Sequence, residues 1–131
     1  MYYIGFFQVL TDQQESDERN RRHGDFSMLI DAGSTEQALE LFRRRLITLR
    51  TSSSFFTGKC KVYITQLLEF EQVPRDEAVM LNLKSYGGDP ILPFISCIVP
   101  TEQSDACSIH DWQHNHPTTE GQRDNMFIQF D

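Results

Sequence analysis

The chain has 131 residues, of which 39% are hydrophobic and 24% are charged, and its formal net charge is −7. This length suits one domain with room for a tail, and such a domain can be stable without a metal or cross-links. No apolar run approaches the roughly 18 residues that a membrane-spanning helix needs, and the acidic excess disfavours duplex DNA and anionic membranes as partners. The first residues lack the pattern of a secretory signal, and the cysteines are too few for a disulfide framework, so we expect a cytoplasmic protein.

The first 31 residues predict two strands joined by a long polar loop. Residues 2–10 are apolar on both alternating faces, which is typical of a central strand covered on two sides. Residues 12–25 contain eight charges and no apolar side chain, so we expect this segment to be a mobile loop. Alternation resumes with Phe26, Met28 and Ile30 on one face and predicts a second, antiparallel strand.

The clearest predicted element is a helix that starts after Gly33. Ser34 and Gln37 have the spacing of a capping box, in which two side chains satisfy free backbone N–H groups of the first turn. Apolar residues at helical spacing then occupy an arc of about 100° and form a stripe that faces the core. These residues are Ala38, Leu39, Phe42, Leu46 and Leu49. The run of Thr and Ser at 51–54 ends the helix.

Three more strands are expected after the helix. Residues 59–70 are rich in strand-forming residues, with Cys60, Val62 and Ile64 on one face and Tyr63 and Leu67 on the other. Apolar residues alternate over 79–83, and 91–99 form a last apolar run. Because of Pro93, this run is expected to be an edge strand or to begin after Pro93. The predicted order is β-β-α-β-β-β, an α+β fold in which an antiparallel sheet packs on one long amphipathic helix.

Charge and composition change after residue 100. Residues 1–100 hold 13 acids and 11 bases, a net charge of −2, whereas residues 101–131 hold six acids and one base, a net charge of −5. We therefore expect a core domain over 1–100 and an acidic, histidine-containing segment over 101–131. That segment is expected to form a short helix, ended by Pro117, or an irregular tail.

The acidic segment contains the best candidate for a metal site. Three of the four histidines and one cysteine lie between residues 107 and 116. In a helix, Cys107, His110 and His114 would share an arc of about 60° and could hold zinc, with water or a carboxylate as fourth ligand. The stretch 110–114 looks like the H-E-x-x-H pattern of zinc peptidases with Asp111 in the Glu position, but no third ligand is evident. The alternative is a set of solvated histidines in a last helical turn.

Arginines in the 12–25 loop suggest a second kind of site. Arg19, Arg21 and Arg22 would bind RNA if they combined with exposed aromatic rings, as on other sheet platforms. Acidic residues precede them in the loop and offset their charge, and the helix arginines at 43–45 and 50 do not form one stripe. An internally paired, solvated surface is the alternative interpretation.

No catalytic motif supports an enzyme, and nothing in the sequence requires a cofactor, with zinc as the alternative. We therefore expect a small protein-binding or regulatory module, such as an inhibitor, an immunity-type protein or an accessory subunit. The acidic segment would meet a basic patch of a protein partner, with aromatic side chains supplying affinity. The candidate residues for this surface are Trp112, Asp111, Phe127 and Phe130.

Overall fold

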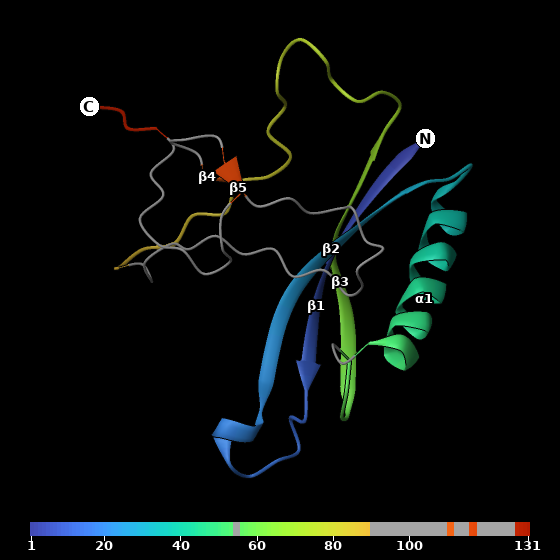
Figure 1. Ribbon diagram of the computed structural model, residues 1–131, viewed down its shortest axis with the longest axis vertical. Coiled ribbons are helices and arrows are strands. Elements are labelled where there is room, and N and C mark those ends of the chain that lie inside the picture. The colour runs from blue at the N-terminus through green and yellow to red at the C-terminus, as the bar shows by residue number, and fades with distance from the viewer. Residues whose placement is uncertain (54–55, 90–109, 112–115, 118–127) are drawn as a thin grey trace. The chain divides into compact units, whose positions relative to one another are not determined.

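The computed structural model describes residues 1–53, 56–89, 110–111, 116–117 and 128–131 (Figure 1). It divides the chain into two units, Met1–Leu83 and Lys84–Asp131, which are described separately below. The predicted division at residue 100 falls outside the described residues and stays a prediction. None of the helices in the described ranges is long and apolar enough to cross a bilayer.

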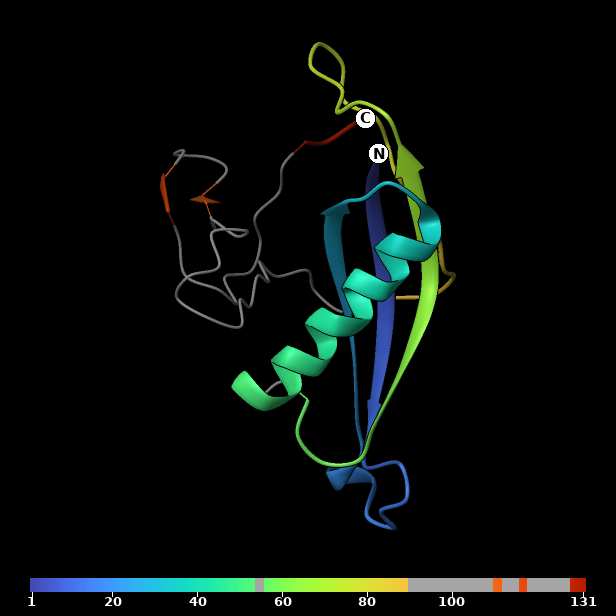
Figure 2. The same ribbon diagram turned by 90° about the vertical axis from the view of Figure 1, so that its right-hand side faces the viewer.

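The first unit is an antiparallel three-stranded sheet with one long helix. Its elements are β1 (Tyr2–Thr11), β2 (Arg22–Asp31), α1 (Thr35–Ser52) and β3 (Cys60–Phe70), with a short 3-10 turn at Glu18–Asn20. The strand order is β2-β1-β3, so β1 is the central strand, and α1 runs along one face of the sheet (Figure 2). The predicted α+β class with an antiparallel sheet and one helix is therefore confirmed.

Strand β2 begins earlier than the sequence pattern indicated. The β1–β2 ladder runs without interruption from the pair Tyr2↔Asp31 to the pair Thr11↔Arg22. Part of the expected loop, from Arg22 onwards, is therefore strand, because backbone hydrogen bonds extend a hairpin without needing apolar side chains. The remaining connection contains the 3-10 turn, which Asp17 caps by accepting a hydrogen bond from the Arg19 backbone N–H at 3.0 Å.

Helix α1 begins and ends almost where the pattern placed it. The Ser34 hydroxyl accepts a hydrogen bond from the Gln37 N–H at 3.1 Å, and Gln37 Oε1 accepts one from the Gly33 N–H at 2.6 Å. These two bonds satisfy donors that the first helical turn leaves free, so the predicted start is confirmed. Within the predicted stripe, Ala38, Phe42 and Leu49 are buried.

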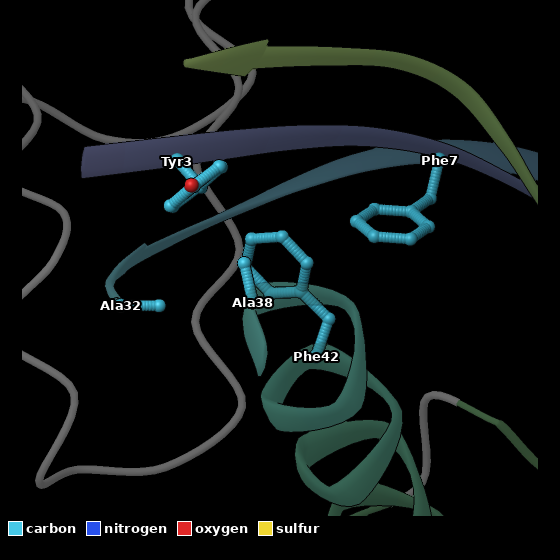
Figure 3. Packing of buried hydrophobic residues seen from close by; sticks show 5 residues of the cluster. All are labelled: Tyr3, Phe7, Ala32, Ala38 and Phe42. Atoms are coloured by element: carbon cyan, nitrogen blue, oxygen red, sulfur yellow. The ribbon is translucent and has the colours of Figure 1, made fainter. Parts of the chain in front are cut away.

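The core lies between α1 and the sheet. Its buried cluster consists of Tyr3, Phe7, Ala32, Ala38 and Phe42 (Figure 3). The Phe7 ring meets the Phe42 ring edge-on, with centroids 5.6 Å apart, a favoured arrangement of aromatic pairs. Gly5 makes this possible, since a Cβ on Gly5 would lie 2.6 Å from Phe7 Cε2 and 3.1 Å from Phe42 Cε2.

The predicted strands after β3 are not confirmed. Residues 71–89 contain no strand, although Val79, Met80, Leu81 and Leu83 alternate partly as a strand would and are 45–78% exposed. Alternation alone is insufficient, because a strand also needs a neighbour for its backbone hydrogen bonds. The expected strand 91–99 lies outside the described residues.

In the second unit, the described residues include one small antiparallel ladder. Strand β4 (His110–Asp111) pairs with β5 (His116–Pro117), with His110 opposite Pro117 and Asp111 opposite His116. The expected helix up to residue 116 is therefore wrong at these positions, whose backbone is extended and paired. Antiparallel pairing of His110 with Pro117 and of Asp111 with His116 is incompatible with a helix at these residues.

Candidate functional site

The structure leaves the predicted zinc site untested. Cys107 and His114 lie outside the described residues, and His110 lies in β4. The helical spacing that grouped the three side chains does not apply at His110, because the backbone there is extended. No group of three His, Cys, Asp or Glu side chains in the described parts of the chain is arranged to hold a metal ion.

The predicted partner-binding residues of the acidic segment are likewise only partly described. Trp112 and Phe127 lie outside the described residues, and Asp111 forms part of β4. The side chain of Phe130 is 86% exposed. This surface stays a prediction.

The loop arginines are placed at one end of the sheet. Arg19 forms an ion pair with Asp17, with Arg19 Nη2 2.9 Å from Asp17 Oδ2. This side-chain contact, with the Arg19 backbone N–H, lowers the pKa of Asp17, and the same carboxylate raises the pKa of Arg19. Arg21 and Arg22 are exposed. Arg19 is therefore partly neutralised, which weakens the argument for a phosphate-binding group.

Polar groups at the same end of the sheet hold two connections together. Asp12 has a φ of 55° and accepts a hydrogen bond from the Lys59 N–H at 2.9 Å. Arg50 donates to the carbonyl oxygens of Phe56 and, at 2.7 Å, Gly58. These bonds fix the chain between α1 and β3, so the groups have a structural role.

The face of the sheet that does not contact α1, here called the open face, is the strongest candidate for a functional surface. Paired residues of antiparallel strands share a face, and successive residues alternate between faces. Since Tyr3 and Phe7 belong to the core, Tyr2, Ile4, Phe6, Gln8 and Leu10 belong to the open face. Their partners are His23, Asp25, Ser27, Leu29 and Asp31 on β2 and Lys61, Tyr63, Gln66, Leu68 and Phe70 on β3.

A β-bulge decides which β3 side chains reach the open face. The register shifts between Phe6 and Phe7, and Thr65 is the extra residue, with its hydroxyl donating to the Phe6 carbonyl at 3.1 Å. Tyr63 and Gln66 therefore share the open face, whereas Leu67 packs against the core. The prediction that Leu67 and Tyr63 share a face was wrong, because strict alternation does not detect a bulge.

Much of the open face is apolar. Its aliphatic and aromatic residues are Tyr2, Ile4, Phe6, Leu10, Leu29, Tyr63, Leu68 and Phe70. The side chain of Leu29 is 64% exposed and that of Tyr63 is 48% exposed, and the rings of Tyr2 and Phe70 stack with centroids 5.8 Å apart. Contiguous apolar patches of this kind mark interaction sites on soluble domains.

Polar contacts on the open face lie mainly at its margins. On the β2 side, Asp31 Oδ1 accepts a hydrogen bond from the Met1 amino group at 3.2 Å, and Asp25 is exposed. Towards β3, Gln66 Oε1 accepts a hydrogen bond from Asn82 Nδ2 at 3.2 Å. The arrangement is therefore suited to binding an apolar strip whose flanks are polar.

The sequence pattern missed this surface for a specific reason. Apolar residues on both alternating sets of positions in β1 were interpreted as a strand covered on two sides. In the structure, Tyr3 is 1% exposed on the helix side, whereas Tyr2, Ile4 and Phe6 on the open face are half-buried. The low number of predicted helices was the available signal, since one helix covers one face of a sheet.

No family model, curated protein or solved structure matches this chain.

Proposed function

We propose that this chain is a protein-binding module, acting as a regulatory, inhibitory or accessory protein, and that the open face is its binding surface. The observation that supports this proposal is the exposure of Leu29 and Tyr63 on a face where eight of the fifteen side chains are aliphatic or aromatic. A solvated face of an antiparallel sheet normally alternates to polar residues.

The dimensions of the open face favour an amphipathic helix as the bound element. Three strands at about 4.8 Å spacing and ten residues at about 3.3 Å rise give a face about 14 Å by 33 Å. A helix with its side chains is about 10–12 Å across, so one helix of about 22 residues would fill it. Helix α1 lies along the opposite face of the same sheet, against β1 and β2 (Figure 2).

The charges at the β2 margin favour a helix with basic flanks. Asp25 and Asp31 lie along this margin of the open face. Complementary charge at the rim speeds encounter, and the buried apolar strip supplies most of the affinity.

The proposal is tested with a defined probe and a matched pair of variants. The probe is a synthetic amphipathic Leu/Lys helix, and its control is the same peptide with Glu in place of each Lys. Leu29 and Ile47 are each 64% exposed, but Leu29 lies on the open face and Ile47 lies on α1. Leu29→Lys should weaken Leu/Lys peptide binding at least about tenfold, whereas Ile47→Lys should leave it unchanged.

NMR chemical-shift changes give the location of binding. The proposal predicts that the Leu/Lys peptide causes its largest shift changes at Tyr2, Phe6, Leu29 and Leu68. The melting temperatures of Leu29→Lys and Ile47→Lys should equal that of the wild type, which shows that both variants are folded. Equal binding by the two variants, or shift changes centred on α1, would contradict it. Binding of a single-stranded RNA oligonucleotide that falls steeply with salt would instead support the hypothesis based on Arg19, Arg21 and Arg22.

The zinc hypothesis has its own test. Elemental analysis of protein purified without an affinity tag should detect about one zinc per chain if Cys107, His110 and His114 bind the metal, and changing His110 and His114 to Ala should remove it. This outcome would not bear on the open face, whose residues contain no cysteine.

A further inference from the structure

The outer edge of β2 is a ten-residue strand edge with unusual continuity. Within Met1–Leu83 the sheet order is β2-β1-β3, and no described strand of this unit pairs with the outer side of β2. The strand runs from Arg22 to Asp31 without a register shift against β1 and without proline. Uninterrupted edges of this length are templates for pairing with another strand.

One hydrogen bond fixes which backbone groups point outward. The Ala32 N–H donates to the Met1 carbonyl at 2.9 Å, so even-numbered residues of β2 exchange hydrogen bonds with β1. The odd-numbered residues therefore direct their N–H and C=O groups to the outer edge. These residues are His23, Asp25, Ser27, Leu29 and Asp31, and all of their side chains are exposed.

The other edge of the sheet is interrupted. The bulge at Thr65 breaks the regular spacing of β3. Bulges are a device by which natural sheets prevent edge pairing. The two edges therefore differ, and pairing through β2 alone produces a closed pair, not a filament.

We propose that two copies of this chain pair antiparallel through β2, around a two-fold axis at Ser27. This register places Ser27 opposite Ser27 of the second copy and uses all five outward-facing residues. It also places His23 of each copy opposite Asp31 of the other, so the basic start of one strand meets the acidic end of the second. Shifting the centre to Met28 would instead place Asp25 opposite Asp31, two like charges.

The dimer would extend the proposed binding surface. A two-fold axis perpendicular to the sheet keeps both α1 helices on one side and both open faces on the other. The joined face would measure about 28 Å by 33 Å, or about 920 Å², which exceeds the roughly 800 Å² per partner of a standard interface. This consequence rests on the proposed function, whereas the dimer itself does not.

The first measurement is the mass of the full chain by sedimentation equilibrium over a roughly hundred-fold range of concentration. The mass should rise toward twice 15.3 kDa as concentration increases. Ser27→Pro removes the outward N–H at the centre of the pairing, and its control Ser27→Ala retains it. The proline variant should dimerise at least about tenfold more weakly, because the central pair exchanges two hydrogen bonds.

A charge exchange tests the register without depending on proline. His23→Asp alone should weaken dimerisation about three- to tenfold by placing two carboxylates opposite each other, and Asp31→Lys alone removes the carboxylate from that pair. The double variant places an acidic and a basic side chain opposite each other and should restore the dimerisation lost in His23→Asp. A single mass of 15.3 kDa at every concentration, or a double variant no better than His23→Asp alone, would overturn the proposal. Peptide binding by a monomer would leave the proposed function intact, so the two failures are distinguishable.

Discussion

Replacing Gly5 with alanine tests the account of the core. Gly5 lies in the central strand on the side that faces α1, opposite Met28 on one neighbour and Leu67 on the other. An added Cβ would lie 2.6 Å from Phe7 Cε2 and 2.8 Å from Phe7 Cζ. The Phe7 ring cannot easily move away, because it stacks on Phe26 at a centroid distance of 5.1 Å and meets Phe42 edge-on.

The expected change in stability of Gly5→Ala follows from two opposing effects. Overpacking a well-packed core costs about 1–3 kcal/mol, and Gly→Ala recovers about 0.4–1 kcal/mol through the lower entropy of the unfolded chain. Gly24 provides a matched control on the same face, since its nearest contact to an added Cβ is Val9 Cγ1 at 3.7 Å. Gly24→Ala should therefore be neutral or slightly stabilising, whereas Gly5→Ala should be destabilising by about 1–2 kcal/mol.

Thermal denaturation measures the difference. For a domain of 60–100 residues each kcal/mol shifts the melting temperature by about 4–8 °C, so Gly5→Ala should melt at least about 4 °C below Gly24→Ala. Phe7→Leu should lower the melting temperature less in the Gly5→Ala background than in the wild type, because the smaller side chain relieves the clash with the Cβ added at residue 5. Equal melting temperatures for the two alanine variants would refute the close approach described for Gly5.

Three further predictions concern single side chains. Burial, with the hydrogen bond to Glu69, raises the pKa of Tyr3 above 10.0, so its contribution to stability is lost as pH rises past that value. Above pH 10, the free energy of unfolding should therefore fall less steeply with pH in Tyr3→Phe than in the wild type. An equal slope in the two proteins would contradict this. The Arg19 side chain and backbone N–H lower the pKa of Asp17 below 3.8, so the stabilisation from this contact is present above that pH and lost on acidification. Arg19→Ala should therefore raise the pKa of Asp17, measured as the midpoint of its NMR titration. Ser34→Ala should lower the free energy of unfolding by about 1 kcal/mol, measured by urea denaturation, because it removes the cap, whereas Ser34→Asp should retain it. Equal stability of the two variants would show that the cap contributes nothing.

The sequence was sufficient for the elements whose signals are local. Helix α1 was predicted from its capping box and apolar stripe. The bonds of Ser34 and Gln37 confirm the first, and the burial of Ala38, Phe42 and Leu49 confirms the second. Strand β1 was predicted from its apolar residues, and its central place in the sheet agrees with that interpretation. Local patterns succeed here because caps and stripes need only neighbouring residues.

The remaining features depend on pairing between distant residues. The bulge at Thr65 is defined by the β1–β3 register, which no spacing within residues 59–70 reveals. The early start of β2 at Arg22 follows from its ladder with β1, not from its own side chains. The open face could not be predicted for the same reason, since it exists only once three strands have a common register.

The proposed surface and the proposed dimer are linked by area. A face of about 14 Å by 33 Å is about 460 Å², and if about half of it is apolar, covering it would contribute about 6 kcal/mol at 25 cal/mol per Å². Association costs an estimated 4–15 kcal/mol in lost translational and rotational freedom and in ordering, so one open face supports only weak binding. Two faces joined through β2 double the apolar contribution, while a partner that spans both loses its translational freedom once. Partner affinity should therefore rise with the concentration of this chain until the dimer is fully formed.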